Sequence, residues 1–324
     1  MSRFLIASVI LVWMGCLLSC KSDKSSNALD QLNLTVEYPD SNVPHLIVLG
    51  IAQDAGYPQA DCKKSCCKEL WNDKSKRKMV SCLGLRDPSS KKAWLFDATP
   101  DFKDQLKILE ADKYELAGIF LTHAHMGHYT GLMHLGREAM GAKKIPVYVM
   151  PRMKEYLETN GPWSQLVSLE NIEIRQLQSK IEVPLTESLN IKPFLVPHRD
   201  EFSETVGFEI NSKKIEALFI PDIDKWEKWD EDINLIVKQC DYAFLDGSFY
   251  RNGEIWGRDM SQIPHPFIEE SLNRFSGLED ADKKKIHFIH FNHTNPVLDQ
   301  RSMEYIDFEK TGFRLAEELQ IVDL

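Results

Sequence analysis

Three histidines of this chain fall within six positions: His123, His125 and His128. They come directly after the apolar run 118–121, which is typical of a buried strand that ends in a loop. His123 and His125 are two positions apart and therefore project to the same side of an extended segment. Neutral imidazole is the commonest nitrogen ligand for zinc. Because the chain has only ten histidines in 324 residues, this clustering predicts a metal site.

Several later apolar runs also end next to a residue that could bind a metal or take part in catalysis. Mixed imidazole and carboxylate ligands suit zinc best, with iron and manganese as alternatives. We therefore expect loops at one edge of a β-rich sandwich to build a single site. The residues at these strand ends are His198, Asp222, Asp246 and His290.

The metal-binding motifs need a framework of alternating strands and helices. The pattern predicts a hairpin around residues 87–90 and a helix that follows the histidine segment over residues 128–140. Pro151 is at a favoured first position for a helix that ends near Gly161. Further strands are predicted over residues 45–50, 118–121, 145–149, 191–196, 206–210, 217–220, 242–245 and 286–289.

The N-terminal residues are not expected to belong to the folded domain. Arg3 and the apolar run 4–18 are typical of a secretory signal. The signal ends at Cys20 in a sequence that looks like a bacterial lipobox, which predicts a lipoprotein signal peptide over residues 1–20 with Cys20 lipidated. The alternative is an uncleaved anchor helix. Either arrangement predicts a membrane-attached protein of the cell envelope, periplasmic or at the cell surface.

Residues 21–42 begin with small polar side chains and are predicted to be a flexible tether. The rest of the chain contains no linker-like, repetitive or low-complexity stretch, so residues 43–324 are predicted to form one domain. The hydrophobic fraction of 43% is normal for a globular protein with a sizeable core. The formal net charge of −10 argues against a nucleic-acid substrate. We expect a small-molecule substrate instead, which includes a small anion held by local arginines.

Three cysteines lie close together at Cys62, Cys66 and Cys67. In an exported protein, a disulfide is the first expectation for them. A structural metal site with three thiolates is an alternative that their short spacing fits loosely, and free thiols are a third possibility. The sequence leaves the three readings open.

The order of the histidines and the aspartate resembles that of the metallo-β-lactamase fold superfamily: His-x-His-x-x-His, a distant histidine, a strand-end aspartate and a late histidine. That fold is an α/β protein, a four-layer αββα sandwich. Three segments resemble the pyrroloquinoline quinone biosynthesis protein B-like group of this superfamily. They are residues 49–59 with the cysteines that follow, residues 96–101 and residues 289–296.

The resemblance implies a ligand set for one or two zinc ions, with iron or manganese as alternatives. It places His123, His125 and His198 on one ion and His128 and His290 on a second, with Asp222 bridging them. The ions would activate a water and polarise a substrate oxygen. Two strand-end carboxylates, Asp97 and Asp246, are candidates to orient the ligating imidazoles.

One residue departs from the family pattern. Most hydrolytic members have an aspartate before the third histidine of the motif, whereas this chain has Gly127. The consequence is a single ion, a substitute ligand or altered chemistry. Asp54 and His293 are the candidate substitutes, and with Asp222 they complete the predicted catalytic residues. If the second site is only weakened, Gly127→Asp should raise its occupancy.

The leading functional hypothesis is an exported metal-dependent hydrolase. Its metal-bound hydroxide would attack an ester, lactone, amide or phosphodiester. The first alternative is an iron-dependent oxidoreductase that resembles the quinone-biosynthesis protein, and the second is a non-catalytic binding lipoprotein. Arg199, Arg258 and Asp259 are candidates to contact substrate. Three tryptophans, Trp226, Trp229 and Trp256, are candidates for a pocket wall.

Overall fold

The computed structural model describes residues 43–110 and 113–324. The predicted signal peptide, the lipidation site Cys20 and the tether 21–42 lie outside the described residues. Among the helices of the described ranges, none is both long and apolar enough to cross a membrane.

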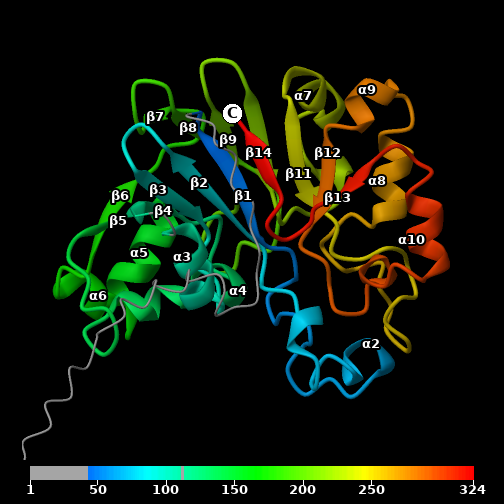
Figure 1. The fold of residues 1–324 in the computed structure, drawn as a ribbon, viewed down its shortest axis with the longest axis horizontal. Helices are drawn as coiled ribbons and strands as arrows, with labels where there is room; N and C mark the ends of the chain where they lie inside the picture. The colour runs from blue at the N-terminus through cyan, green and yellow to red at the C-terminus, as the bar shows by residue number, and fades with distance from the viewer. Residues whose placement is uncertain (1–42, 111–112) are drawn as a thin grey trace, which may run out of the picture.

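Two seven-stranded sheets form the centre of the fold (Figure 1), with strand orders β14-β1-β2-β3-β4-β5-β6 and β13-β12-β11-β10-β9-β8-β7. The first sheet contains β1 (His45–Gly50), β2 (Cys82–Asp87), β3 (Lys92–Phe96), β4 (Glu115–Phe120), β5 (Ile145–Val149), β6 (Ile172–Gln176) and β14 (Ile321–Asp323). The second contains β7 (Val183–Pro184), β8 (Asn190–Leu195), β9 (Val206–Asn211), β10 (Glu216–Ile220), β11 (Tyr242–Asp246), β12 (Ile286–Ile289) and β13 (Arg314–Leu315). Both sheets are mixed, because β3 to β6 and β10 to β13 run parallel while β1, β2 and β3 pair antiparallel.

Helices cover the outer face of each sheet (Figure 1). On the first sheet lie α3 (Phe102–Leu109), α5 (Pro151–Thr159) and α6 (Trp163–Ser168), and on the second lie α8 (Ile268–Arg274), α9 (Asp280–Lys283) and α10 (Met303–Phe308). The remaining elements are α2 (Ser65–Lys68), α4 (Met126–Tyr129), α7 (Ile233–Gln239) and the 3-10 turns η1 (Lys74–Lys76), η3 (Thr130–Leu135), η4 (Trp226–Lys228) and η5 (Pro296–Leu298). This arrangement confirms the expected four-layer αββα sandwich.

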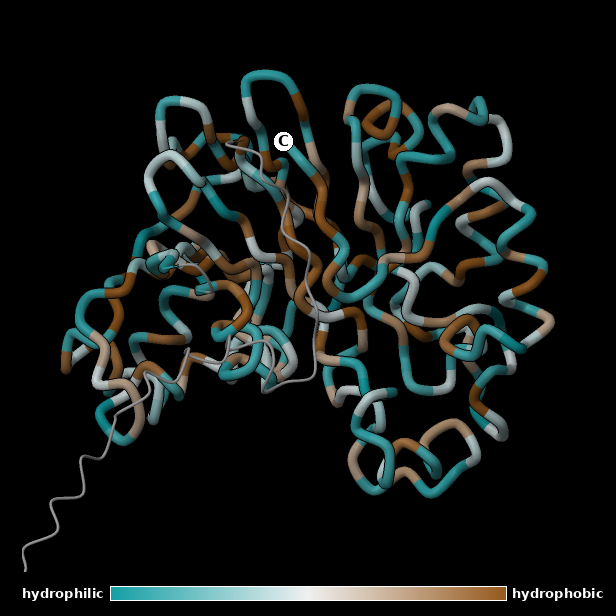
Figure 2. Tube along the Cα trace, viewed as in Figure 1, coloured by the Kyte–Doolittle hydropathy of each residue, from teal (hydrophilic) through white to brown (hydrophobic). Residues whose placement is uncertain are grey.

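The alternation of side chains along the strands creates two hydrophobic layers. On β1, Leu46 belongs to the core between the sheets, whereas Ile47 faces the helices of the first sheet. Phe96 shows the contact across the sheets, since its ring centroid lies 5.5 Å from that of Phe208 and 6.2 Å from that of Phe219. Figure 2 shows that hydrophobic residues gather along the strands and hydrophilic residues in most outer loops.

The prediction of one helix over residues 128–140 is wrong in its length. The chain forms the short helix α4, continues as the 3-10 turn η3 and then leaves helical structure. Backbone contacts with the end of β3 explain the break, because the Gly131 N–H donates to Ala98 O at 2.9 Å and the Ala98 N–H donates to His128 O at 2.8 Å. A Cβ atom on Gly131 would lie 2.2 Å from Thr99 O, so glycine is required for this close approach.

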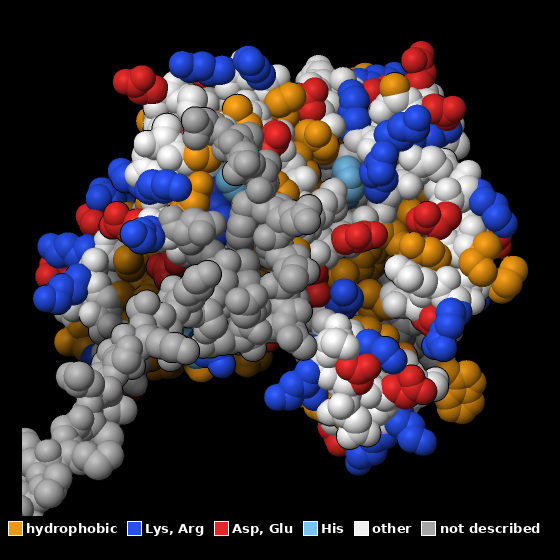
Figure 3. Space-filling model, viewed as in Figure 1, with side chains coloured by type: hydrophobic (Ala, Val, Ile, Leu, Met, Phe, Trp, Pro, Cys, Tyr) orange, Lys and Arg blue, Asp and Glu red, His pale blue; other side chains and the backbone are white. Residues whose placement is uncertain are grey.

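A small lobe, residues 53–79, projects from the sandwich between β1 and β2 and carries α2 and η1 (Figure 1). We call it the cysteine lobe. Its buried side chains Cys62, Cys67 and Leu70 belong to none of the three hydrophobic clusters of the described structure. Figure 3 shows the lobe as a separate protrusion with many Lys and Arg side chains on its surface. The lobe therefore has very little apolar core of its own.

Candidate metal centre

Strand ends from both sheets bring seven potential metal ligands together. The end of β4 supplies His123 and His125, and α4 supplies His128. The ends of β8, β10 and β12 supply the other three ligands predicted from sequence, and the segment after β1 supplies a carboxylate. These four residues are His198, Asp222, His290 and Asp54. We call the seven residues the metal centre.

The first ligand set consists of His123, His125 and His198, whose ligand atoms all lie within 4.8 Å of one another. His123 Nε2 lies 2.8 Å from His125 Nδ1. The other ring nitrogen of His125 lies 3.0 Å from Glu201 Oε2, so Nδ1 is the nitrogen left for a ligand. Both ring nitrogens of His198 are buried without a hydrogen-bond partner. A buried imidazole with no partner is costly unless something coordinates it, so this site fits a metal ion.

The second ligand set consists of Asp54, His128, Asp222 and His290. His128 Nε2 lies 2.8 Å from Asp222 Oδ2 and 3.2 Å from Asp54 Oδ1. His290 Nε2 lies 3.3 Å from each of the same two oxygens. Asp222 also approaches the first set, because its oxygens lie 3.7 Å from His123 Nε2 and 3.8 Å from His198 Nε2. The position of Asp222 between the sets is the one that a bridging carboxylate needs.

Asp54 occupies the space that a side chain at position 127 would fill. A Cβ atom built on Gly127 would lie 2.6 Å from Asp54 Cγ and 2.6 Å from its Oδ1. Gly127 lacks the carboxylate that most hydrolytic members of the family have at this position. Because it has no side chain, it leaves space for the carboxylate of Asp54. Of the two substitute ligands expected from the sequence, the structure brings Asp54 to this place.

His293 does not lie at the metal centre, which corrects the expectation that placed it there as a substitute ligand and catalytic residue. Its Nδ1 lies 3.5 Å from Cys66 Sγ and 3.4 Å from Cys67 Sγ. Cys62 Sγ completes the group at 4.0 Å from Cys66 Sγ. The turn after His290 directs His293 away from the centre and toward the cysteine lobe. We call Cys62, Cys66, Cys67 and His293 the cysteine cluster.

The cysteine cluster has the dimensions of a tetrahedral zinc site. Zn–S bonds of about 2.3 Å and Zn–N bonds of about 2.0–2.1 Å place tetrahedral ligand atoms roughly 3.8 Å apart for two sulfurs and roughly 3.6 Å apart for sulfur and nitrogen. The observed separations of 3.9–4.0 Å and 3.4–3.5 Å agree with these values. All of the described cysteines are free thiols, so the disulfide that ranked first among the sequence alternatives is not formed.

Hydrogen bonds fix the orientation of the ligating imidazoles. Asp97 Oδ2 lies 2.7 Å from His128 Nδ1, as expected for an orienting carboxylate. Ser248 Oγ lies 2.9 Å from His290 Nδ1, and Thr122 Oγ1 lies 2.9 Å from His123 Nδ1. Asp97 and His290 have φ angles of +72° and +68°, in the left-handed region that side-chain-bearing residues rarely adopt. Such strain is concentrated at functional sites.

A further histidine, His265, was missed by the sequence reasoning. Its Nδ1 lies 2.7 Å from Asp246 Oδ2 and 3.4 Å from Asp222 Oδ1. Its ring centroid lies 5.2 Å from that of His198. Asp246 thus orients His265 and not one of the predicted ligands. The only local signal was the Pro264-His265-Pro266 sequence in a long irregular segment, because His265 follows no strand.

The carboxylates and His123 have protonation states that suit metal coordination, but His128 does not. Against the effect of burial, the neighbouring carboxylates hold the pKa of His128 well above its ordinary value, so a metal ion would have to displace its proton. Burial opposes the charge on Asp222, but His290 and His128 hold the pKa of its carboxyl well below the usual value. Hydrogen bonds from His128 and His290 have the same effect on the pKa of Asp54, also against burial. Burial lowers the pKa of His123 well below its ordinary value. Ionised carboxylates and neutral imidazoles are the forms that bind metals.

The residues expected to contact substrate are divided between the centre and the surface. Arg199 Nη2 lies 3.4 Å from His125 Nε2, at the edge of the first ligand set. Arg258 and Asp259 lie on the exposed part of their loop, where Asp259 accepts a hydrogen bond from the Ser261 N–H at 2.9 Å. Among the tryptophans, Trp226 is buried in the core, Trp229 lines a separate cavity of about 610 Å³ and Trp256 is 94% exposed.

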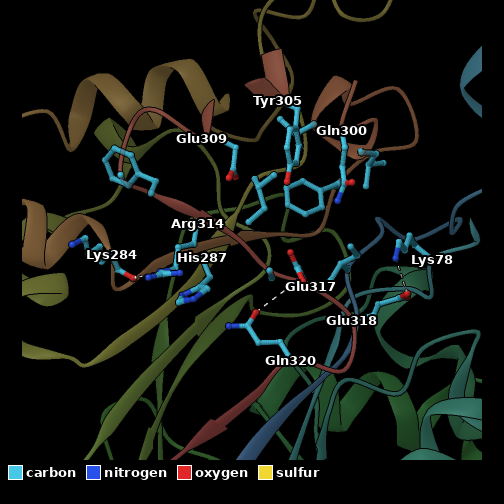
Figure 4. A pocket seen from close by; sticks show the side chains of 18 residues that line it. Lys78, Lys284, His287, Gln300, Tyr305, Glu309, Arg314, Glu317, Glu318 and Gln320 are labelled. Atoms are coloured by element: carbon cyan, nitrogen blue, oxygen red, sulfur yellow. Dashed lines mark hydrogen bonds and ion pairs between the residues drawn. The ribbon is translucent and has the colours of Figure 1, made fainter. Parts of the chain in front are cut away.

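A cavity of about 670 Å³ opens at the edge of the sandwich, between β12, β13, α10 and the connection to β14 (Figure 4). Phe291 and Phe313 line it together with charged side chains of both signs. Lys78 and Glu318 form an ion pair of 3.3 Å there. None of the seven ligands of the metal centre lines this cavity. The residues that could bind a metal therefore lie at the metal centre and not in this cavity.

Comparison with known proteins agrees with this geometry. The family model described as the Beta-lactamase superfamily domain matches residues 93–291. Coenzyme PQQ synthesis protein B of Methylococcus capsulatus is 24% identical over 308 residues, which is 85% of this chain and 98% of that protein. The crystal structure of Zn(2+)-bound PqqB from Methylobacterium extorquens has a TM-score of 0.73 at 21% identity and covers 86% of this chain and 100% of that one. A diphosphatase from the PhnP family has a TM-score of 0.64 at 20% identity, with coverage of 87% and 97%.

Proposed function

Because this chain belongs to the β-lactamase superfamily, we propose that it is a metal-dependent hydrolase that acts on an ester, lactone, amide or phosphodiester. The observation that carries this proposal is the position of Asp222 between two ligand sets, each with enough ligands for one ion. When bound, the ions would supply a water with a pKa lowered toward neutrality and positive charge beside the attacked oxygen.

The residues of the chain have separate tasks in this scheme. Asp54 and Asp222, which both lie close to His128 and His290, would hold the second ion as ionised carboxylates and balance part of its charge. The groups that hydrogen-bond the outer ring nitrogens keep each imidazole in one orientation, which reduces the reorganisation needed during reaction. Arg199 stands beside the first ligand set and can hold an anionic group of the substrate.

We propose zinc as the resident metal, with iron or manganese as alternatives. Three imidazoles in the first set and mixed imidazole and carboxylate ligands in the second suit zinc in particular. Elemental analysis of protein purified without added metal measures which ion is present and how many per chain. Two ions in the metal centre and one in the cysteine cluster are the expected content.

The hydrolase proposal is tested with a panel of chromogenic esters, lactones, phosphodiesters and β-lactams. We expect His123→Ala and His198→Ala to lose activity on any substrate that the wild-type protein cleaves, together with the ion of the first set. His134→Ala is the matched control, because His134 lies on η3 outside the ligand sets. Retention of both metal and activity in the two ligand variants would contradict the proposal.

A second candidate function is an iron-dependent oxidoreductase. It is supported by the relatives named coenzyme PQQ synthesis protein B, which match most of this chain. Oxygen uptake by the iron-loaded protein with tyrosine-derived or quinone precursors distinguishes the two activities. Metal binding without turnover in either assay would favour the third hypothesis, a binding protein that retains the fold.

For its location, we propose a lipid anchor at Cys20 that holds the protein in the cell envelope. The support is the sequence of the first twenty residues alone. Labelling cells with a radioactive fatty acid should mark the wild-type protein and not Cys20→Ala, and the variant should leave the membrane fraction. An unlabelled wild-type protein would contradict the anchor.

For the cysteine cluster, we propose a structural zinc ion. The spacing of its three sulfurs and one nitrogen supports this proposal, and so does the scarcity of apolar side chains in the lobe around it. Four protein ligands leave no open position for a substrate, so this site is not expected to take part in catalysis.

A further inference from the structure

We propose that the cysteine cluster is a positioning site for the metal centre: an ion bound there holds Asp54 in the space left by Gly127. The centre would then obtain its missing carboxylate from the cysteine lobe. This inference rests on the proposed two-ion centre and adds a dependence of one metal site on the other.

The first step of the argument is the complementarity of two residues. Asp54 Cα would lie 2.5 Å from a Cβ atom on Gly127, and Asp54 Cγ would lie 2.6 Å from it. Both the backbone and the carboxyl group of Asp54 therefore use the space of the absent side chain. Its Oδ1 then lies 3.2 Å from His128 Nε2 and 3.3 Å from His290 Nε2.

The second step concerns what keeps Asp54 there. The Gln53 N–H donates to Phe291 O at 2.9 Å, which attaches one side of the segment to the strand end beside His290. On the other side, Tyr57 and Lys78 exchange backbone hydrogen bonds of 2.8 and 3.2 Å within the lobe. Because the lobe contributes no residue between Gln53 and Lys78 to a hydrophobic cluster, its packing supplies little further order.

The third step is the position of the cysteine cluster in the chain. Cys62 lies eight residues after Asp54, and His293 lies three residues after His290. One ion bound by the cluster would therefore tie together the two segments that carry ligands of the second set. Without it, the Asp54 segment would keep its backbone hydrogen bonds, including the one from Gln53 to Phe291, but it would lose the attachment through Cys62 and gain backbone freedom on that side. The ligands of the first set come from other segments and would be unaffected.

The experiment measures metal affinity and not turnover. Full-length wild-type protein and Cys66→Ser are stripped of metal and titrated with Co²⁺, whose absorption distinguishes thiolate ligands from nitrogen and oxygen ligands. We expect Cys66→Ser to lose the thiolate-bound ion and to bind the ion of the second set at least tenfold more weakly. The ion held by His123, His125 and His198 should keep its affinity.

A ligand swap tests whether Asp54 transmits the effect. The double variant Asp54→Gly/Gly127→Asp moves the carboxylate from the lobe to α4. In this background, Cys66→Ser should leave the affinity of the second set unchanged. An equal loss of affinity at the second set in both backgrounds would overturn the proposal. So would a Cys66→Ser single variant whose second set binds the ion as tightly as that of the wild type.

Two controls keep the result interpretable. Cys240→Ser removes a buried thiol at the end of α7, away from both sites, and should leave all affinities unchanged. His293→Gln removes the nitrogen ligand and serves as the second variant if Cys66→Ser does not fold, with circular dichroism as the check. A failed hydrolase assay would leave the binding result intact, whereas a wild-type protein that binds no ion at the second set would overturn the inference by itself.

Discussion

At the scale of single residues, Gly127 and Asp54 compete for one volume beside His128. The sequence predicts that Gly127→Asp raises the occupancy of the second site if that site is only weakened, but in the structure Asp54 already occupies the space for the new side chain. The Cβ atom of the new side chain would lie 2.5 Å from Asp54 Cα and 2.6 Å from its Oδ1. One of the two segments therefore has to move, and the two neighbouring carboxylates would also repel each other.

We therefore predict that Gly127→Asp alone lowers stability by about 1–3 kcal/mol, the usual cost of overpacking. Asp54→Gly in the same protein should restore part of the loss, since it removes the clash with Cγ and Oδ1 but leaves Cα at residue 54 close to the new Cβ atom. Urea unfolding of the two single variants and the double variant measures the coupling between them. Additive effects of the two substitutions would show that the residues do not share this space.

His287 gives a pH dependence that is independent of the metal centre. It lies on β12 with 4% of its surface exposed, and its ring centroid is 5.3 Å from that of Phe244. Burial lowers the pKa of His287 to about 4 from its ordinary 6.5. The unfolded chain therefore takes up the proton first as the pH falls, and stability present above pH 6.5 is lost progressively toward pH 4.

We predict that His287→Gln reduces the loss of stability between pH 7.5 and pH 4.5 by about 2 kcal/mol. The measurement is urea unfolding at both pH values for the wild type and the variant. His134→Gln is the matched control, because it changes a half-buried histidine on η3 that packs against Phe102. Parallel pH curves for the wild type and His287→Gln would contradict the prediction.

At the scale of elements, the turn from α4 into η3 positions His128. The backbone of Gly131 is hydrogen-bonded to Ala98, so this turn is fixed to the end of β3. Asp97, the neighbour of Ala98, holds the ring of His128 from the same strand end. The strand end thus determines both the path of the turn and the direction of the imidazole.

Gly131→Ala should break this contact, since its Cβ atom would meet Thr99 O at 2.2 Å. We predict a loss of about 2 kcal/mol or more in the free energy of unfolding, together with weaker metal binding by His128. Gly277→Ala is the control, because a Cβ atom there meets nothing within 4 Å. Equal stability of the two variants in urea would show that the close approach is not required.

At the scale of the whole molecule, the metal centre joins the two sheets. Its ligands come from the ends of β1 and β4 in one sheet and of β8, β10 and β12 in the other. An ion shared by both sheets binds the folded chain and not the unfolded one, so it stabilises the fold by mass action. The molecule and its metals should therefore unfold together.

A free ion at a hundredfold excess over its dissociation constant stabilises the folded chain by about 2.7 kcal/mol. We therefore predict that a chelator, which removes the ion, lowers the melting temperature by roughly 5–10 °C. Returning Zn²⁺ should reverse the shift. His123→Ala/His198→Ala should respond less to the chelator, because it already lacks the first ligand set. A chelator effect of equal size in this variant would place the stabilising ion elsewhere.

The sequence by itself determined the fold class and most of the ligands. Strand periodicity and the position of each donor just past an apolar run are local properties, and they were enough to predict that His123, His198, Asp222 and His290 gather at one edge. The resemblance to the superfamily supplied the four-layer order of the sandwich. The break after α4 was missed because it depends on a contact with the end of β3, which no local pattern contains.

Only the tertiary structure decided which loops meet. It placed Asp54 in the space of Gly127, turned His293 toward the three cysteines and brought His265 to Asp222. Each of these contacts joins segments far apart in the chain, and their meeting depends on the packing of two whole sheets. Spacing along a sequence specifies which side chains a strand end presents, but not which distant loop fills the space beside them.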